Sequence, residues 1–122
     1  MTKFLVVDDS EFMRLTIKNR LKKIEDNDVE EVEEAKNAKE AFEKYKEFKP
    51  DIVTMDILMP IENGLDAVKK IVDFDPEARI IMISAVGQEN IVEEAMKIGA
   101  KGYVVKPIKQ ENLEKAVKKV KK

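Results

Sequence analysis

Five polar residues that could take part in chemistry follow apolar runs of this 122-residue sequence. They are Asp8, Asp9, Asp56, Ser84 and Lys106. Neighbouring carboxylates repel one another, and a hard divalent cation such as Mg²⁺ removes that penalty. A lysine beside such a cation favours a phosphoryl group, whose oxygens a serine hydroxyl can also bind. An aspartate carboxylate can act as a nucleophile toward phosphorus, so the set suits metal-assisted phosphoryl transfer.

Asp56 is the candidate reactive group of this set. The largely apolar run 52–55 predicts a short strand that ends at Asp56, because a charged residue inside a strand is costly to bury. At the carboxyl end of a parallel strand, a side chain lies in the crevice where such sheets hold ligands. Each residue of the set also has an ordinary explanation. An aspartate can open a loop or cap a helix, a serine can end a strand, and a lysine can lie in a loop.

The elements that must position these residues follow from the apolar pattern. Strand and helix alternate five times, which predicts a parallel sheet with helices on both faces and right-handed crossovers. The carboxyl ends of the strands then share one edge of the sheet. The predicted strands are Lys3–Asp8, a weak acidic edge strand within Glu25–Glu34 that could equally be a surface loop, Ile52–Met55, Arg79–Ser84 and Tyr103–Val105.

The composition removes several classes of chemistry. The chain has no cysteine, hence no disulfide and no thiolate, and no histidine, hence no imidazole base and no histidine-bound metal. A net charge of −2 lacks the basic footprint of nucleic-acid binders. The longest apolar run, Ile80–Ile83, is far shorter than the roughly 20 residues that span a bilayer. We therefore expect a cytoplasmic protein with neither nucleic acid nor membrane as its partner.

Several short motifs occur in a characteristic order along the whole chain. They are Val6-Val-Asp-Asp9, Met55-Asp56, Met59-Pro-Ile-Glu-Asn-Gly64, Ser84-Ala85, Gly99-Ala100 and Tyr103-Val-Val-Lys-Pro107. In these motifs the sequence resembles the receiver domains of two-component response regulators, and within them the CheY-like chemotaxis regulators. The stretches 8–14 and 84–88 carry the finer likeness, although the receiver of the chemotaxis methylesterase opens similarly.

The resemblance implies a fold. Receivers have a flavodoxin-like (βα)5 arrangement, a doubly wound five-stranded parallel sheet with strand order 2-1-3-4-5, of which CheY is a known example. Residues 1–122 would form a single receiver domain. Because the sequence ends soon after the fifth predicted helix, with no linker, we expect a stand-alone regulator.

The resemblance also implies residue roles. Asp56 would accept a phosphoryl group from a sensor histidine kinase, for which a chemotaxis kinase is the first candidate. Asp8 and Asp9 would bind the Mg²⁺ cofactor together with Asp56 and the backbone carbonyl of Leu58. The protein would then be no enzyme toward other substrates, beyond its own phosphorylation and a slow dephosphorylation.

Three further residues would form the switch that the resemblance implies. Lys106 would pair with the phosphoryl group, and its peptide bond to Pro107 would be cis. Ser84 would bind a phosphoryl oxygen, and Tyr103 would change rotamer. These shifts would alter the face of helix four, strand five and helix five, to which a motility-apparatus or adaptor protein would bind.

Two departures from the family pattern concern the loss of the phosphoryl group. Leu58 and Val86 stand where many relatives have polar side chains near the attacking water, and neither can orient that water. We therefore predict slow self-dephosphorylation and a role for a separate phosphatase. Ile61 also replaces a residue that is commonly small, which leaves the shape of its loop open.

Other functions stay open beside this one. A phosphorelay intermediate and a receiver detached from a DNA-binding regulator would share the same site. A metal-dependent aspartate-nucleophile phosphatase usually has Asp-x-Asp after its first strand, whereas Asp8 and Asp9 are adjacent. A nucleotide-binding module would need a glycine-rich phosphate loop, and no such motif follows any predicted strand.

Overall fold

The structure, a computed structural model, describes residues 2–24, 29–59 and 63–121. Five parallel strands form one sheet in the order β2-β1-β3-β4-β5, which confirms the predicted fold and strand order. Helices alternate with the strands along the chain. The elements are β1 Thr2–Val7, α1 Glu11–Lys22, β2 Val29–Ala35, α2 Ala38–Phe48, β3 Ile52–Asp56, α3 Gly64–Phe74, β4 Ile80–Ser84, α4 Glu89–Ile98, β5 Gly102–Val105 and α5 Gln110–Lys121.

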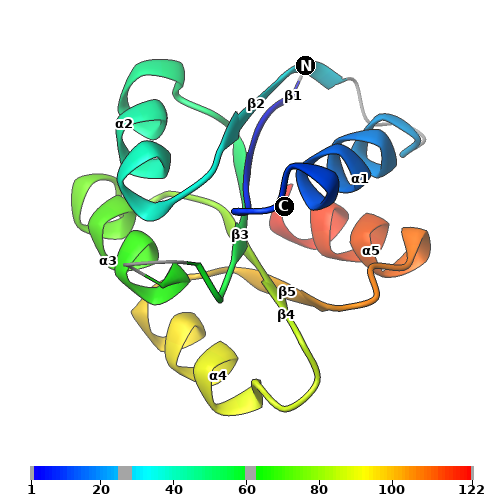
Figure 1. Cartoon of the computed structure of the whole chain (residues 1–122). Helices are drawn as coiled ribbons and strands as arrows, with labels where there is room; N and C mark the ends of the chain where they lie inside the picture. Colours follow the sequence, from blue (N-terminus) through cyan, green and yellow to red (C-terminus); the bar gives the residue numbers. More distant parts are fainter. Residues whose placement is uncertain (1, 25–28, 60–62, 122) are drawn as a thin grey trace.

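The helices form one layer on each face of the sheet. Figure 1 shows α2, α3 and α4 on one side and α1 and α5 on the other. Alternate residues of the central strands face opposite layers, as the period of a strand requires. Leu5 and Val7 pack toward α2, α3 and α4, whereas Phe4 and Val6 pack toward α1 and α5. The continuous apolar run of β1 is therefore buried on both faces, as the sequence predicts for a central parallel strand.

The acidic segment that could form either an edge strand or a surface loop is a strand in the structure. Residues 29–35 form β2 and pair in parallel with β1, from Thr2 opposite Val29 to Val7 opposite Ala35. The strand lies at an edge of the sheet, so its glutamates reach solvent while Ala35 is buried. Part of the predicted range, 25–28, lies outside the described residues.

Side-chain caps start three of the helices. Ser10 accepts a hydrogen bond from the Met13 amide and caps α1. Asn37 caps α2 through the Glu40 amide, but the Glu40 carboxylate accepts from the Lys36 amide instead of the Asn37 amide, so the capping box that this sequence pattern favours is only half formed. The complete capping box belongs to α3, where each side chain of Asn63 and Asp66 accepts a bond from the other's backbone.

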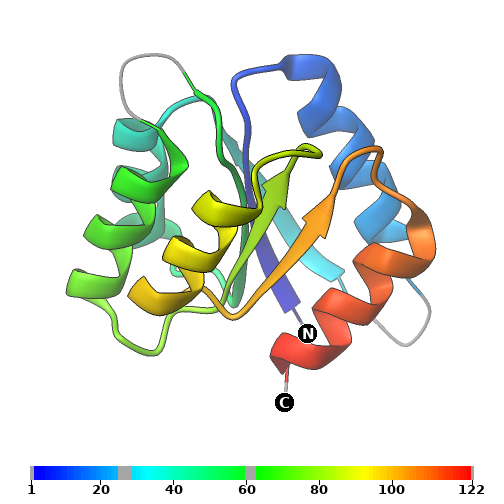
Figure 2. The same ribbon diagram turned by 90° about the horizontal axis from the view of Figure 1, so that it is seen from below.

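The strand ends gather at one edge, where the predicted site should lie. Figure 2 shows the strands running in the same direction and the connections that follow β1, β4 and β5 at the same end of the molecule. The registers agree, because Val7 lies opposite Met55, Asp56 opposite Ile83, and Ser84 opposite Val105. Side chains from distant parts of the sequence can therefore meet there.

Candidate functional site

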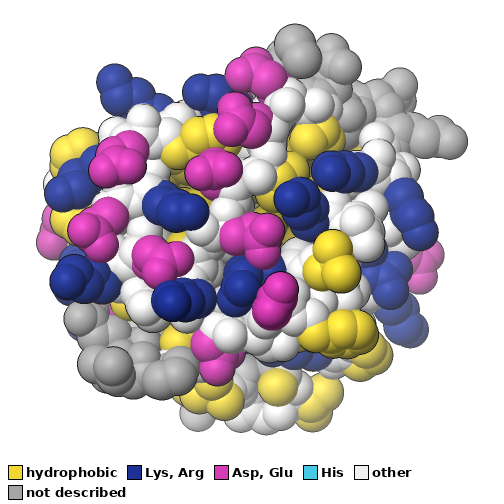
Figure 3. All heavy atoms as spheres, turned by 45° about the horizontal axis from the view of Figure 1, so that its top comes forward, with side chains coloured by type: hydrophobic (Ala, Val, Ile, Leu, Met, Phe, Trp, Pro, Cys, Tyr) yellow, Lys and Arg dark blue, Asp and Glu magenta, His cyan; other side chains and the backbone are white. Residues whose placement is uncertain are grey.

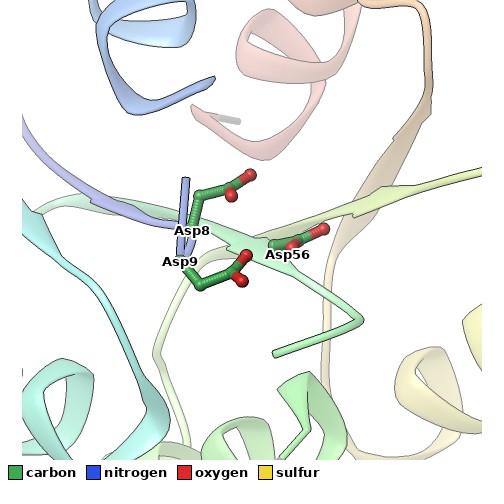
Figure 4. Close-up of side chains that lie close together, drawn as sticks. All are labelled: Asp8, Asp9 and Asp56. Atoms are coloured by element: carbon green, nitrogen blue, oxygen red, sulfur yellow. The ribbon is translucent and has the colours of Figure 1, made fainter. Parts of the chain in front are cut away.

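Three carboxylates meet at this edge of the sheet. Asp8 and Asp9 follow β1, Asp56 ends β3, and one carboxylate oxygen from each lies within 4.8 Å of the others. Figure 4 shows the three side chains converging from the two adjacent strands. Asp8 and Asp56 are buried, whereas Asp9 is exposed. Of the three carboxylates in the cluster, only that of Asp9 is therefore exposed to solvent.

Asp8 has only half of its hydrogen-bonding capacity satisfied within the protein. Its Oδ1 atom accepts a hydrogen bond of 2.9 Å from the Ser10 amide, whereas its buried Oδ2 atom has no hydrogen-bond partner. Burial, with a smaller contribution from the charges of Asp56 and Asp9, raises the pKa of Asp8 to about 6 from 3.8. A buried carboxylate oxygen without a donor is a costly feature that a bound cation would relieve.

Lys106 provides the positive charge of the site. Its ammonium donates a hydrogen bond of 3.1 Å to the Oδ1 atom of Asp56 and forms an ion pair with it. Burial raises the pKa of Asp56, and Lys106 partly opposes that rise. The Lys106 amide also donates to the Ser84 carbonyl over 2.7 Å, and the Lys106–Pro107 peptide bond is cis, as predicted.

The donor set fits a hard divalent cation. Carboxylate oxygens are the ligands that Mg²⁺ prefers, and three of them stand close enough to share one ion. The unpartnered Asp8 Oδ2 atom is an independent sign of such a ligand, because it is buried. Asp8, Asp9 and Asp56 would hold the ion, which would neutralise the oxygens of a phosphoryl group when bound.

Arg14 supports the cluster, and the sequence analysis does not identify it. Its guanidinium donates to the Asp8 carbonyl over 2.8 Å and to Glu34 of β2 over 2.9 Å. It therefore ties the end of β1 to both α1 and β2. In the sequence, only its place in the motif of residues 8–14 points to Arg14. Its partner Glu34 lies 20 positions away, so local spacing does not indicate the contact.

Gly64 is a second supporting residue with no predicted role at the site. Its amide donates a hydrogen bond of 2.8 Å to the Ile57 carbonyl. A Cβ atom at this position would overlap the carbonyl oxygen of Asp56. Glycine is therefore required for the close approach of α3 to the end of β3, and the capping box of Asn63 holds the helix there.

The other predicted residues lie around the cluster without joining it. Ser84 is buried at the end of β4, and its hydroxyl forms no hydrogen bond to the carboxylates or to Lys106 within the described residues. Leu58 and Val86 are exposed, and Tyr103 is exposed on β5. Ile61 and Pro60 of the predicted loop lie outside the described residues.

A small cavity separates Ser84 from Tyr103. It has a volume of about 250 Å³ and lies between the β4–α4 connection, α4 and β5. Its walls are mostly apolar, with Val92, Met96 and Val105 among them. Ser84 and Tyr103 therefore both line this cavity. Among the described residues, no hydrogen bond joins their side chains.

The fold and the site together define a doubly wound α/β protein with an acidic, lysine-bearing crevice at the carboxyl edge of its sheet. Comparison with known families matches residues 4–118 to the family described as the response regulator receiver domain. The chain therefore belongs to this family, and it is a CheY-like receiver domain. Receiver domains typically bind Mg²⁺ through acidic residues, with which Asp8, Asp9 and Asp56 are consistent.

Individual relatives cover almost the whole chain. Chemotaxis protein CheY of Thermotoga maritima is 50% identical over 118 residues, which are 97% of this chain and 96% of that protein. A Bacillus subtilis protein named CcdB is 43% identical over 120 residues, 98% of each chain. The CheX-CheY-BeF3-Mg complex from Borrelia burgdorferi superimposes with a TM-score of 0.90 at 34% identity, and covers 99% of this chain and 90% of that one.

Proposed function

We propose that this chain is a Mg²⁺-dependent phospho-acceptor switch, which a sensor histidine kinase phosphorylates on Asp56. Residues 1–122 would act as a single receiver unit. A carboxylate oxygen of Asp56 attacks the phosphorus of a phosphohistidine, and a new oxygen–phosphorus bond forms. The nitrogen–phosphorus bond breaks, and its electron pair returns to the imidazole. No other substrate is turned over.

One observation carries this proposal. The buried Asp56 carboxylate lies 3.1 Å from the Lys106 ammonium and shares a cation-sized space with Asp8 and Asp9. Phosphoryl transfer needs an aligned nucleophile and positive charge near the equatorial oxygens, and we assign these parts to Asp56 and to Lys106 with the cation. The unpartnered Asp8 Oδ2 atom supports the cation, and the backbone carbonyl of Leu58 is a further proposed ligand.

The proposed switch uses the space between Ser84 and Tyr103. A phosphoryl group on Asp56 would offer strong acceptor oxygens to the Ser84 hydroxyl and to the Lys106 ammonium, which pairs with the Asp56 carboxylate in the unmodified protein. Movement of Ser84 would open the 250 Å³ cavity to the Tyr103 ring, which is exposed beside it. The two positions of the ring would present different surfaces along α4, β5 and α5, and phosphorylation would shift their populations.

Chemotaxis is the proposed pathway, with a motility-apparatus or adaptor protein as the output partner. The 50% identity to a chemotaxis protein supports it, while the likeness to CcdB keeps other two-component pathways and a phosphorelay as alternatives. The Borrelia burgdorferi relative forms a complex with CheX, which supports a separate protein that acts at the site, such as a phosphatase. We propose the cytoplasm as the location of the protein, because nucleotide-derived phosphoryl donors are available there.

Neither a nucleic acid nor a membrane is a proposed partner. No described helix has both the length and the apolar character needed to cross a bilayer. Figure 3 shows a face on which Lys and Arg side chains are interspersed with Asp and Glu side chains. Such mixing gives that face no basic stripe for a nucleic-acid backbone.

Intact-mass spectrometry after incubation with acetyl phosphate tests the proposal. The protein should gain the mass of one phosphoryl group in the presence of Mg²⁺, and much less after chelation of the metal. Asp56→Asn should abolish the gain. A gain that persists in Asp56→Asn would refute Asp56 as the acceptor. Steady turnover of a phosphoester substrate would instead favour the hydrolase alternative.

A further inference from the structure

Arg14 joins the end of β1 to the edge strand β2 through two hydrogen bonds of its guanidinium. Its Nη1 atom donates to the Asp8 carbonyl over 2.8 Å, and its Nε atom donates to the Glu34 Oε1 atom over 2.9 Å. Only 15% of the Arg14 side chain is exposed. A guanidinium that is covered to this extent is costly to keep unless its donors are satisfied, so the two bonds fix its position.

The helix α1 places Arg14 where its side chain can reach Asp8. The Ser10 side chain caps the helix, and the Ser10 carbonyl accepts a hydrogen bond of 3.0 Å from the Arg14 amide. Arg14 therefore lies one turn inside α1. Side chains of an α-helix lean toward its N-terminus, which is the end that follows Asp8. The guanidinium consequently meets the Asp8 carbonyl, six residues earlier in the sequence.

The main chain of Asp8 is held by β2 at both of its polar groups. Its amide donates directly to the Ala35 carbonyl over 3.1 Å. Its carbonyl is held, through Arg14, by Glu34, the residue that precedes Ala35. Figure 1 shows β2 beside β1, as the pairing of the two strands requires. The strand β2 contributes no carboxylate to the cluster, yet it fixes the peptide groups on either side of Asp8.

The peptide that Arg14 holds controls two carboxylates of the cluster. It joins Asp8 to Asp9, and Figure 4 shows the side chains of both residues turned toward Asp56. The Asp8 Oδ1 atom accepts from the Ser10 amide, while its buried Oδ2 atom has no partner and stays available to a cation. A shift of this peptide would therefore move two of the three carboxylates at once.

We propose that Arg14, held in place by Glu34, is a positioning residue for the Mg²⁺ site. This inference deepens the proposed function, since it assumes that the three carboxylates hold the cation. Arg14 acts through the peptide between Asp8 and Asp9, which it keeps in the orientation in which both side chains reach the cluster. Replacement of residues that orient metal ligands typically weakens metal binding by about 10- to 100-fold.

The alternative is an ion pair between Arg14 and Glu34 that only stabilises the fold. Lys18 separates the two explanations, because its ammonium lies 3.8 Å from the Glu34 Oε2 atom. No hydrogen bond joins Lys18 to Asp8 in the described part of the chain. The two cations therefore share one partner and differ in their contact with the site, which makes Lys18 the matched control for Arg14.

Titration of the folded protein with Mg²⁺ alone, followed by the NMR signals of the backbone amides around Asp8, tests this inference without a phosphoryl donor. We expect Arg14→Gln to raise the dissociation constant of Mg²⁺ by about tenfold or more. Glu34→Gln should raise it by about threefold, because Arg14 keeps its bond to Asp8 but loses its second anchor. Lys18→Gln should stay within about twofold of the wild type, since an exposed pair contributes little.

Two further variants test how Arg14 acts. Arg14→Lys should recover part of the lost affinity, because a lysine can donate to the Asp8 carbonyl but lacks the rigid fork that also binds Glu34. The double variant Arg14→Gln/Glu34→Gln should bind Mg²⁺ as weakly as Arg14→Gln alone, because Glu34 acts through Arg14.

The rate of labelling by acetyl phosphate gives a second measurement. In Arg14→Gln, the Mg²⁺ concentration that gives half of the maximal rate should rise by the same factor as the dissociation constant. The rate at saturating Mg²⁺ should stay within about threefold of the wild type, because Asp56 and Lys106 are unchanged. A purely structural role would not shift the half-saturating Mg²⁺ concentration of the folded protein.

The outcomes separate this inference from the proposed function. Equal Mg²⁺ affinities of the wild type and Arg14→Gln would overturn the positioning role, and so would equal losses in Arg14→Gln and Lys18→Gln. If Arg14→Gln does not fold, a loss in Glu34→Gln that is absent from Lys18→Gln supports the role, and equal affinities of these two variants overturn it. A wild type that binds Mg²⁺ but is not labelled on Asp56 would refute the proposed function and leave the role of Arg14 standing.

Discussion

The Lys106 ammonium donates a hydrogen bond to the Asp56 Oδ1 atom across a sequence separation of 50 residues. The contact places a cation beside a buried carboxylate, whose pKa burial raises and Lys106 lowers. The same ammonium is close enough to contact a phosphoryl group on that oxygen. The same ammonium that lowers the pKa of Asp56 in the unmodified protein would therefore stabilise the phosphoryl group in the proposed reaction.

Removal of the Lys106 charge should slow phosphorylation. We expect Lys106→Met to reduce the rate of labelling by acetyl phosphate by about 100-fold, since one preorganised charge at a reacting centre contributes about this much. Stopped-flow or quenched mass measurements give the rate. Lys109→Met, which removes an equal charge from a neighbouring exposed residue, should change it little. Equal rates for the two variants would show that Lys106 has no special position.

Asp8→Asn should stabilise the metal-free protein in a pH-dependent way. The pKa of Asp8 is raised to about 6 from 3.8, so the unfolded chain loses this proton at lower pH than the folded protein does. The resulting destabilisation sets in above the lower pKa and is complete above the higher one. Asn removes it, and we expect a gain of about 2 kcal/mol in the free energy of unfolding at pH 7.5.

Urea unfolding without Mg²⁺ measures this effect. The gain should be largely absent at pH 4, where the wild-type carboxyl is protonated in the folded protein. Mg²⁺ should stabilise the wild type more than the variant, because the variant lacks one charged ligand. Asp73→Asn, an exposed change on α3, is the control. A gain that is the same at both pH values would contradict the assignment to Asp8.

Leu58→Asn should shorten the lifetime of the phosphorylated form. The wild-type side chain is exposed beside the site and cannot orient a water molecule, whereas an amide can. We expect dephosphorylation to accelerate severalfold, on the order of the smaller acid–base and positioning effects. Decay of the phosphorylated species after removal of acetyl phosphate gives the lifetime. Leu15→Asn introduces the same amide on α1 and should leave the lifetime unchanged. An unaltered lifetime in Leu58→Asn would contradict the prediction.

Gly64→Ala should disturb the end of β3. The added methyl group would overlap the Asp56 carbonyl oxygen, so α3 or the strand end must shift. We expect a loss of about 2 kcal/mol in the free energy of unfolding, as is typical of overpacking, together with weaker Mg²⁺ binding. Gly102→Ala is the matched control, because its Cβ would meet Val120 at an ordinary distance of 3.4 Å. Thermal unfolding with and without Mg²⁺ compares the two variants.

Local sequence features were sufficient to predict a parallel sheet covered by helices, whereas the strand order followed from the resemblance to receiver domains. The fivefold alternation of strand and helix and the continuous apolar run of β1 predicted a parallel sheet whose strand ends share one edge, and the structure has that arrangement. Only β2 stayed ambiguous, because its glutamates reflect an edge position that depends on the neighbouring strand. The capping box at Asn37 is half formed for a similar reason, since the partner of the Glu40 carboxylate depends on the path of the chain before the helix.

The sequence by itself determined which residues stand at the carboxyl ends of the central strands, because burial favours apolar residues within such strands and tolerates charge more easily where they end. The tertiary structure alone decided how these ends relate. It left one Asp8 oxygen buried without a donor and joined Arg14 to Glu34. Periodicity acts along the chain, whereas distances between side chains of different elements arise only when those elements pack.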